Sequence, residues 1–553
     1  MKLSQYIADE LYKRGVCHVF GYQGGNITNI VDAISTHDGL RYIQTSNEQG
    51  AAFAANGYAQ SRGGLGVAIS SSGPGALNLV TGVANAYYDS IPVLFISGDL
   101  SRRYKKNILP LRQDGFQSTD IVSIVKPITK YARIVNNPDE IGYILSRAFF
   151  EMMTGRKGPA YISIPHWIQG AEIELSTLCT FLPNQPADIS VSNSLRNQVS
   201  VAMKCAQRPI LLIGGGCSDI ETKEALKVFL DLNKVPIVAS LCGISVVPHD
   251  HPSFIGFIGD YGNRHANLAV ATSDCLVVIG SRMDERQVGM LKAYNYNKKI
   301  IHVDIDPSEL HPYSQSYIPL NETALNFLSY FHEICFDVNS LTEWNISLFQ
   351  LQKKYPVLPK TKEFNVLCLL RSVSDKLLHN AQVYADVGLH QMCCAQALKL
   401  SQQKSLFVSG GLGSMGYALP ASIGGYLSSS GKQTICISGD GGLLMGLNEL
   451  QTISREKLNI KIIVINNNCL GMIRQYQLKN FEGRTTGSVE GYLPGDLANI
   501  STAFGLLYYK ISDNSGLDNL FDLLSSEDAA LIEVVFSKDM APFPSQIDYS
   551  LES

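Results

Sequence analysis

Two short polar clusters, each at the end of an apolar strand-like run, constrain the fold of this chain most. Residues 433–438 predict a buried strand and lead directly into Gly-Asp-Gly at 439–441. A helical pattern follows, and a second apolar run at 462–465 ends in Asn-Asn-Asn at 466–468. Neighbouring parallel strands bring their carboxyl ends to one edge of a sheet, where open α/β sheets bind ligands. The pattern therefore predicts an α/β domain with a ligand site at that edge.

Asp440 and Asn467 are the side chains in these clusters best suited to hold a metal ion. Magnesium prefers oxygen ligands in near-octahedral geometry and often completes its shell with phosphate oxygens. One carboxylate and one amide oxygen would leave positions for a diphosphate, which a glycine-rich backbone can approach closely. The glycines are Gly439, Gly441 and Gly442. A Gly-Asp-Gly tripeptide alone could be an ordinary strand-to-helix turn, but the asparagines after the second strand favour a metal site.

The 553 residues divide into three regions that alternate apolar runs with helical patterns. We predict domains over residues 1–175, 190–336 and 364–553, joined by polar connections. Such alternation is typical of parallel sheets covered by helices on both faces. The predicted fold class is therefore α/β, with three parallel-sheet domains.

Composition excludes several other classes of protein. Hydrophobic residues make up 45% and charged residues 17%, as in compact globular proteins, and the net charge of -4 provides no basic field for nucleic acid. No apolar run is long enough to span a bilayer, and the amino-terminal segment lacks the apolar core of a signal peptide. The twelve cysteines include no CxxC pair, which favours reduced thiols. We expect a cytoplasmic protein with neither a membrane nor a nucleic-acid partner.

The strand–GDG–helix–strand–NN arrangement resembles the thiamine-diphosphate motif of pyruvate decarboxylases, acetolactate synthases and transketolases. The resemblance implies thiamine diphosphate and Mg²⁺ as cofactors. It also implies that Asp440, Asn467 and the backbone carbonyl of Cys469 hold the metal. The Cys469 thiol has no part in this.

Glu48 is the expected activating acid. Residues 46–52, Ser-Asn-Glu-Gln-Gly-Ala-Ala, follow a predicted strand and resemble the HEQGA segment of that family. There, a carboxylic acid bonded to the pyrimidine ring nitrogen promotes the imino form of the cofactor, which removes the thiazolium proton. The alternative is an ordinary helix-start glutamate stabilised by the helix dipole.

Other segments resemble the family's cofactor contacts. In the segment SGGLGSMG, Met415 takes the place of the bulky residue that bends the cofactor, although a core methionine is often only packing. The loop at 386–391 looks like a further diphosphate contact, and Gly73 precedes a helix that shapes the pocket floor. The expected contacts from these segments are Gly73, Asp386, Gly388, His390, Gly413 and Met415.

Over nearly its whole length the chain is most similar to acetolactate synthases, with matching segments such as HVFGYQGGNI, GFQSTDIV and LGMIRQYQ. The likeness implies decarboxylation of pyruvate and transfer of its two-carbon unit to a second carbonyl compound. It places Phe116, Gln117, Lys130 and Arg286 in the active site, with Arg286 binding an acceptor carboxylate. Gly24, Met472 and Tyr476 would shape the substrate pocket, with Met472 also near the cofactor. The alternatives are a surface ion pair for Arg286, a solvated Lys130, and simple packing for Met472 and Tyr476.

The departures from the acetolactate synthases lie on the substrate side. Gln23 replaces a proline, Asn47 a histidine and Tyr476 a tryptophan, and residues 256–259 differ from the usual GMHG. The runs RQDGFQSTDIV and KPITKYA and the closing DMAPFP resemble related carboligases of surface-polysaccharide pathways, some of which add a two-carbon unit to a nucleotide-linked keto-sugar. Pyruvate oxidase and 2-keto acid decarboxylase are further alternatives. The decarboxylases carry a histidine pair that the first region of this chain lacks.

The middle region resembles the family's flavin-binding domain, so FAD in a structural role is expected, although some relatives keep the domain without flavin. A glycine triplet after a strand is weak evidence alone. The candidate FAD contacts are Gly214, Gly215, Gly216, Arg282, Asp304 and Ile305. In this family the activating glutamate and the diphosphate site come from different subunits, which implies a homodimer or homotetramer. A regulatory subunit is a possible further partner.

Overall fold

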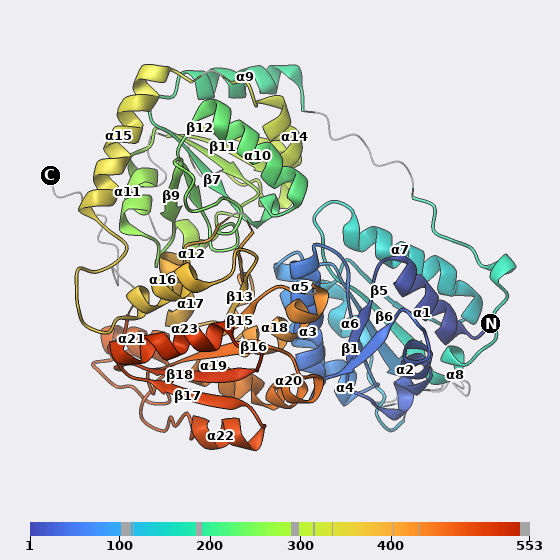
Figure 1. Cartoon of the computed structure of the whole chain (residues 1–553). Helices are drawn as coiled ribbons and strands as arrows, with labels where there is room; N and C mark the ends of the chain where they lie inside the picture. The colour runs from blue at the N-terminus through green and yellow to red at the C-terminus, as the bar shows by residue number, and fades with distance from the viewer. Residues whose placement is uncertain are drawn as a thin grey trace.

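In the computed structural model the chain forms three α/β domains, each built on a six-stranded sheet (Figure 1). The predicted fold class is therefore confirmed. The structure describes residues 1–100, 112–113, 115–183, 191–288, 298–312, 314, 316–334, 336–401, 403–429 and 431–541.

The N-terminal domain has the strand order β2-β1-β3-β4-β6-β5, with parallel pairing throughout. Strands β3, β4 and β6 are buried along their whole length, as expected for a parallel sheet covered on both faces. The strands are β1 (His18–Gly21), β2 (Arg41–Gln44), β3 (Gly66–Ser70), β4 (Val93–Asp99), β5 (Tyr131–Ile134) and β6 (Ala160–Pro165). The helices are α1 (Leu3–Lys13), α2 (Thr28–Ser35), α3 (Glu48–Arg62), α4 (Pro74–Asn78), α5 (Val80–Tyr88), α6 (Ile121–Val125), α7 (Ile141–Met153) and α8 (His166–Gln169).

The central domain has the order β12-β11-β10-β7-β8-β9, again all parallel. Its strands are β7 (Pro209–Ile213), β8 (Ile237–Ala239), β9 (Phe254–Phe257), β10 (Cys275–Ile279), β11 (Lys299–Asp304) and β12 (Ser316–Asn321). Its helices are α9 (Asn193–Lys204), α10 (Ile220–Asn233), α11 (Arg264–Thr272), α12 (Glu285–Val288), α14 (Ala324–Tyr330) and α15 (Val338–Lys354). Helix α15 lies where the sequence predicted a polar connection, because Leu341, Trp344 and Leu348 pack into the central core.

The C-terminal domain has the order β14-β13-β15-β16-β18-β17, also parallel. Its strands are β13 (Gln382–Ala385), β14 (Ser405–Val408), β15 (Thr434–Gly439), β16 (Ile460–Asn466), β17 (Leu507–Ile511) and β18 (Ala530–Val535). Its helices are α16 (Val366–Lys376), α17 (Leu389–Ala397), α18 (Ala418–Ser428), α19 (Asp440–Gly446), α20 (Leu450–Glu456), α21 (Gly471–Asn480), α22 (Leu497–Ala503) and α23 (Leu517–Ser525). The two polar clusters thus follow adjacent strands, β15 and β16, as predicted.

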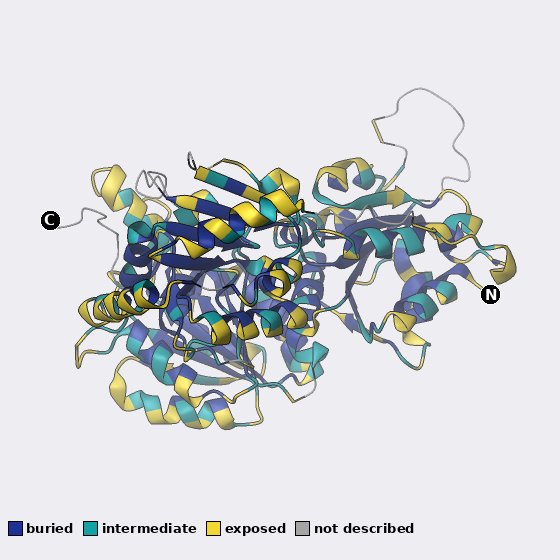
Figure 2. Ribbon diagram, turned by 90° about the horizontal axis from the view of Figure 1, so that it is seen from above, coloured by how far each residue is buried: buried dark blue, intermediate teal, exposed yellow. Residues whose placement is uncertain are grey.

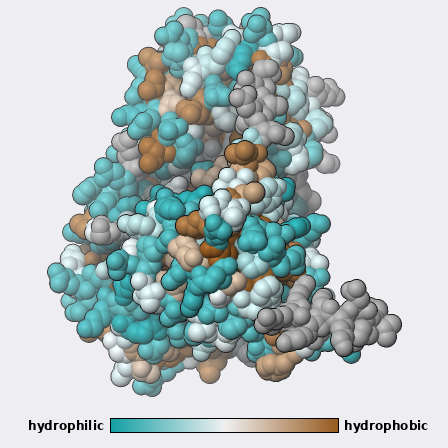
Figure 3. Space-filling model, turned by 90° about the vertical axis from the view of Figure 1, so that its right-hand side faces the viewer, coloured by the Kyte–Doolittle hydropathy of each residue, from teal (hydrophilic) through white to brown (hydrophobic). Residues whose placement is uncertain are grey.

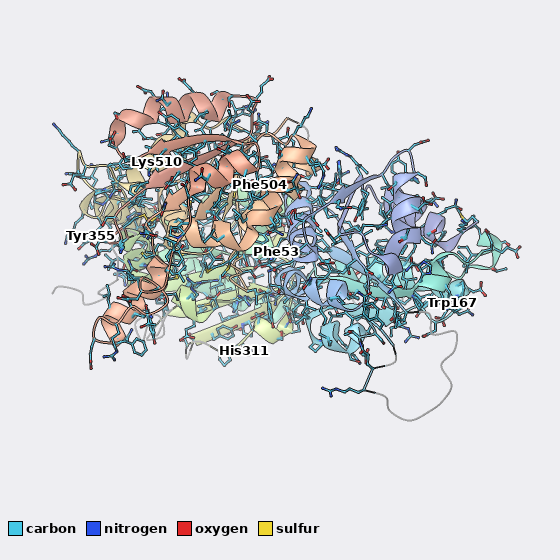
Figure 4. The ribbon with its side chains drawn as sticks, turned by 90° about the horizontal axis from the view of Figure 1, so that it is seen from below. Phe53, Trp167, His311, Tyr355, Phe504 and Lys510 are labelled. Carbon is cyan, nitrogen blue, oxygen red and sulfur yellow. The ribbon has the colours of Figure 1, made fainter. Side chains whose placement is uncertain are left out.

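The N-terminal and C-terminal domains share one hydrophobic core. Phe53 of α3 lies at their junction (Figure 4) and packs edge-on against Tyr417, with ring centroids 5.3 Å apart. Buried residues fill the sheets, whereas exposed ones lie mainly on the outer helices (Figure 2). On the face seen in Figure 3, hydrophobic side chains are scattered among hydrophilic ones, with several in a hollow near the middle. None of the helices in the described ranges has both the length and the apolar character needed to cross a lipid bilayer.

Glycines bring α3 and α18 into backbone contact at this junction. A Cβ atom added at Gly57 would lie 2.0 Å from the carbonyl oxygen of Ala421, and one at Gly424 would lie 1.8 Å from that of Ala54. Neither distance is possible for a real side chain, so the two helices require glycine at their crossing. The crossing is the main connection between the two domains that carry the predicted site.

We expect Gly424→Ala to destabilise the protein by about 1–3 kcal/mol, because the added methyl group forces α18 away from the α3 backbone. Denaturant unfolding measures the change. Gly64→Ala is the matched control, since a Cβ there meets only the Arg62 side chain, at 3.9 Å. Equal stability of the Gly424 and Gly64 variants would contradict the close crossing.

Candidate active site

Asp440 is the first residue of α19, directly after β15, and its side chain is almost completely buried. Its Oδ2 atom is buried and has no hydrogen-bond partner among the described residues. Burial raises the pKa of this carboxyl to about 6. An unpartnered buried carboxylate oxygen is costly unless a ligand satisfies it, so the atom fits a metal ligand.

Asn467 and Cys469 lie beside Asp440 because β15 and β16 pair in parallel, with Gly439 opposite Ile465. Asn467 and Cys469 are both buried, and Asn468 between them takes a left-handed φ of 51°. Burial raises the pKa of the Cys469 thiol, and the negative charge of Asp440 raises it further. The second effect is expected because the two groups lie close together. The predicted ligand set is therefore brought together at one edge of the sheet.

The chemistry of this set suits a hard cation. Within the described ranges, no three His, Cys, Asp or Glu side chains gather in a way that could hold a metal. The edge instead offers a carboxylate, an amide oxygen and a backbone carbonyl. Mg²⁺ prefers such oxygen ligands, whereas zinc prefers nitrogen and sulfur ligands.

Three side chains converge at Gly441, on the sheet edge that carries Asp440 and Asn467 and that we call the proposed metal edge. A Cβ atom added there would lie 2.7 Å from Leu470 Cδ2, 3.1 Å from Tyr492 Oη and 3.5 Å from Met415 Cε. Burial and the Asp440 charge both raise the pKa of Tyr492. Tyr492 could not be predicted from the sequence, because it lies far along the chain in a loop with no recognisable motif. Met415 also reaches this edge, and its predicted contact with the cofactor stays a prediction.

His390 supports the end of β15. The backbone N–H of Gly439 donates to His390 Nε2 at 3.1 Å, and burial lowers the pKa of the imidazole to about 4. Gly388 has a φ of 153°, and a Cβ added there would lie 2.7 Å from the His390 ring. The ring is thus neutral and is held against the strand that presents Asp440. The predicted diphosphate contact of His390 and Gly388 stays a prediction.

Asp386 uses its carboxylate to shape the turn that carries Met415. Oδ1 accepts from the backbone N–H of Gly416 at 2.9 Å, and Oδ2 accepts from that of Ala418 at 3.0 Å. The side chain is fully buried, which raises its pKa to about 6. Gly413 is left-handed in the same turn, with a φ of 71°. Asp386 therefore fixes the turn that carries Met415. Its predicted contact with a diphosphate stays a prediction.

Glu48 begins α3 and is buried at the carboxyl edge of the N-terminal sheet. Its Oε2 atom accepts from Asn78 Nδ2 at 2.9 Å, and a Cβ added at Gly75 would lie 2.9 Å from Oε1. Asn47 caps the helix by accepting from the Gly50 N–H at 2.7 Å. This cap explains why an asparagine at position 47 suits the start of α3. Asn78 was not predicted, although an amide in the short helix α4, which follows the next strand, is a signal that could have pointed to it.

Four more predicted residues lie in or beside loops that pack at the 71–75 segment, whose Gly75 approaches Glu48. Gly73 is left-handed, with a φ of 59°, and a Cβ added there would lie 2.7 Å from the Gln117 carbonyl oxygen. Gln117 is itself left-handed, and the neighbouring Phe116 is 85% exposed. A Cβ added at Gly24 would lie 2.6 Å from Ser71 Cβ. Close packing of these loops therefore requires glycine at positions 24 and 73.

Lys130 and Arg286 lie outside both groups. The Lys130 ammonium donates to the Thr154 carbonyl, and burial lowers its pKa. Arg286 is exposed on α12. Burial raises the pKa of Asp260, and the positive charge of Arg286 partly offsets that rise. Among the described contacts, no hydrogen bond or ion pair joins either side chain to Glu48 or Asp440. Their active-site roles stay predictions.

Helix α21 starts just after Cys469 and carries the two predicted pocket residues. Met472 packs against the C-terminal core, as the packing alternative expected. Tyr476 is 61% exposed and meets the Phe481 ring edge-on. No residue of α21 is buried, so the helix presents Tyr476 to an open surface of the single chain.

Contacts within the protein account for the candidate flavin-binding residues of the central domain. Cβ atoms added at Gly214 and Gly216 would lie 1.9 Å and 2.8 Å from backbone atoms of Gly280. Gly215 faces Cys242 at 3.1 Å. The other candidates make local contacts: Asp304 Oδ1 accepts from the Asp306 N–H at 2.9 Å, Arg282 lies 3.6 Å from Asp284, and Ile305 accepts from Asn321 at 3.0 Å. The glycine triplet thus needs no flavin, and FAD stays a prediction.

Comparisons with known proteins agree with this geometry. Three models of the thiamine pyrophosphate enzymes match: the N-terminal TPP binding domain at residues 1–124, the central domain at 197–330 and the C-terminal TPP binding domain at 386–534. The chain is 33% identical to the acetolactate synthase isozyme 2 large subunit of Escherichia coli, covering 97% of this chain and 95% of that one. It is 31% identical to the acetolactate synthase large subunit of Lactococcus lactis, with 98% and 93% covered. The chain therefore belongs to the thiamine pyrophosphate enzymes, and its cofactor is thiamine diphosphate.

We expect the free energy of unfolding to decrease as the pH falls from 6.5 towards 4, because the buried His390 ring resists protonation. The unfolded chain takes up a proton near pH 6.5, whereas the folded protein resists protonation until about pH 4. The free energy of unfolding should therefore decrease by about 1.4 kcal/mol per pH unit within that window. His390→Gln keeps an acceptor for Gly439 but binds no proton, so denaturant unfolding at several pH values should show a shallower dependence. The same slope in both proteins would contradict a buried neutral imidazole.

Proposed function

We propose that this enzyme is a carboligase that decarboxylates pyruvate and transfers the remaining two-carbon unit to a second carbonyl compound. The observation that carries the proposal is the unpartnered buried oxygen of Asp440 beside Asn467. Glu48, buried at a second sheet edge, supplies the acid that the same chemistry requires. The similar proteins named acetolactate synthase large subunits support this reaction.

Asp440, Asn467 and the Cys469 carbonyl would hold Mg²⁺, which in turn binds the cofactor's diphosphate. Gly441 leaves room at this edge because its missing Cβ keeps Leu470, Tyr492 and Met415 clear of the backbone. When bound, thiamine diphosphate supplies an acidic ring carbon that adds to a 2-keto acid and accepts the electrons released with carbon dioxide. Met415, held by its Asp386-bonded turn, would press on the cofactor from the side.

Glu48 holds the proton that activates the cofactor. Asn78 donates to Oε2, which leaves Oε1 to share a proton with the pyrimidine ring nitrogen. Gly75 leaves room beside that oxygen, because a Cβ added there would lie 2.9 Å from it. Gln117 and Gly24 lie at the same edge and would line the path of the substrate.

The complete site would form between two copies of the chain. Within the described residues of one chain, no hydrogen bond joins Glu48 to Asp440, Asn467 or Met415. A homodimer or homotetramer would place Glu48 of one chain against the metal edge of another. A regulatory subunit is also proposed, because the similar proteins are named large subunits. FAD in the central domain, with a structural role, completes the proposed cofactors.

The acceptor is proposed to be a 2-keto acid, with Arg286 binding its carboxylate. Arg286 is exposed on α12, and its side chain makes no hydrogen bond or ion pair among the described contacts that would hold its guanidinium away from a carboxylate. A nucleotide-linked keto-sugar has no such carboxylate and is the alternative acceptor. Incubation with pyruvate, thiamine diphosphate and Mg²⁺, with and without such a keto-sugar, followed by product identification, distinguishes the two.

Glu48→Gln should abolish carbon dioxide release from pyruvate while the cofactor still binds, because the amide cannot share a proton with the pyrimidine nitrogen. A loss of about a hundredfold or more is expected for removal of an essential acid. Glu221→Gln is the matched control, since Glu221 also lies in the first turn of a helix, α10, but is exposed. Normal turnover by the Glu48 variant would contradict the proposed function.

Asp440→Asn should weaken Mg²⁺-dependent binding of thiamine diphosphate at least tenfold, by about 1.4 kcal/mol or more. The change removes the charged ligand but keeps the size of the side chain, so the fold should survive. Titration of the cofactor at several Mg²⁺ concentrations measures the effect. Asp496→Asn, at the exposed cap of α22, is the control. Unaltered metal dependence in the Asp440 variant would place the metal elsewhere.

A further inference from the structure

Glu449 of the C-terminal domain contacts the turn that leads into Glu48. It ends a short 3-10 helix, Leu447–Glu449, after α19, and it is only 1% exposed. The Ser46 N–H donates to Glu449 Oε1 at 3.0 Å and to Oε2 at 3.3 Å, and the Asn47 N–H lies 3.4 Å from Oε1. The two domains therefore meet through a buried carboxylate placed immediately before the activating acid.

The packing around this carboxylate leaves no spare room. A Cβ atom added at Gly50 would lie 2.1 Å from Glu449 Oε1, so the first turn of α3 lies directly against the carboxylate. The Ser46 hydroxyl also donates to the Asn448 carbonyl at 2.7 Å. On the other side, the Thr452 hydroxyl donates to Glu449 Oε2 at 2.7 Å. The position of Glu449 thus determines the position of the Ser46–Asn47 turn.

Ordinary helix capping does not explain Glu449. The side chain of Asn47 already caps α3 by accepting from the Gly50 N–H. The N–H groups of Ser46 and Asn47 precede the helix and could be satisfied by water. Burying a carboxylate is costly, and burial raises its pKa, but the surrounding N–H and O–H donors offset that cost. Such an arrangement is expected where a loop has to be held in one position.

We propose that Glu449 is a positioning residue for Glu48. By binding the two backbone N–H groups directly before Glu48, it sets where the Glu48 carboxyl meets the pyrimidine ring of the cofactor. The inference rests on the proposed role of Glu48. Reactive groups need placement within roughly 0.5 Å, and a shift of about 1 Å in a supporting loop can cost about a hundredfold in rate. Glu449 acts through this placement and does not touch the reacting atoms.

Two variants test the contact from its two sides. Glu449→Gln keeps the size of the side chain but turns an NH₂ group towards N–H donors. Gly50→Ala leaves Glu449 intact and displaces it with a methyl group. Glu456→Gln is the control, because Glu456 also lies at the domain boundary, paired with Arg41, but away from the Ser46–Asn47 turn.

Two measurements report on position. Amide hydrogen exchange over residues 44–52 of the cofactor-free protein should be faster in both variants than in the wild type. At saturating thiamine diphosphate and Mg²⁺, exchange of the thiazolium ring proton with deuterium should slow by about tenfold to a hundredfold. The Glu456 variant should match the wild type in both.

The outcomes separate this inference from the proposed function. Wild-type exchange of the ring proton in either variant that folds, at saturating cofactor, would overturn the role of Glu449, even if stability decreases. A wild-type enzyme that does not accelerate this exchange over the free cofactor would instead contradict the proposed function of Glu48. Slower ring-proton exchange in both variants, together with faster amide exchange, supports the positioning role.

Discussion

The backbone contact between α3 and α18 is the constraint on which the rest of the site depends. Gly57 and Gly424 let the two helices touch, so the N-terminal and C-terminal domains share one core. Helix α3 starts with Glu48, and α18 starts just after the turn that carries Met415. The same crossing thus places both Glu48, the proposed activating acid, and Met415, the proposed wedge of the cofactor. A wider crossing would move both helices and separate the residues that each one presents.

Buried carboxylates hold the turns that lead into Met415 and Glu48. Asp386 accepts backbone N–H bonds from the Met415 turn, and Asp89 of the N-terminal domain accepts them from Gly410 and Gly411 just before it. Glu449 does the same for the turn before Glu48. Burial raises the pKa of each of these groups, and backbone donors oppose that rise. Asp440 differs because one of its oxygens has no partner among the described residues, as a ligand to a metal ion would require.

Much of this could be predicted because the information is local. Apolar runs followed by helical patterns predict parallel strands, and the polar clusters after β15 and β16 have to share an edge once those strands pair. Glu48 was predicted from the resemblance of residues 46–52 to the family's HEQGA segment, because a strand end and a helix start alone fit an ordinary helix-start glutamate equally well. Contacts with partners far along the chain could not be predicted. The bonds from the Gly416 and Ala418 N–H groups to the Asp386 carboxylate are an example, whereas the predicted diphosphate contact of Asp386 stays a prediction. Helix α15 lies in a stretch that was predicted as a polar connection, although Leu341, Trp344 and Leu348 are spaced to bury one helix face.

The sequence by itself determined the class of fold and the placement of Asp440 and Asn467 after neighbouring strands, since both depend on residue types at short spacing. The cofactor was indicated by the resemblance to the thiamine-diphosphate enzymes. Only the tertiary structure decided which groups support Asp440 and Asn467. Tyr492 reaches the proposed metal edge, Asn78 bonds Glu48, and Glu449 holds the Ser46–Asn47 turn through contacts between distant segments. Such contacts depend on how whole sheets and helices pack, and no local pattern records that packing.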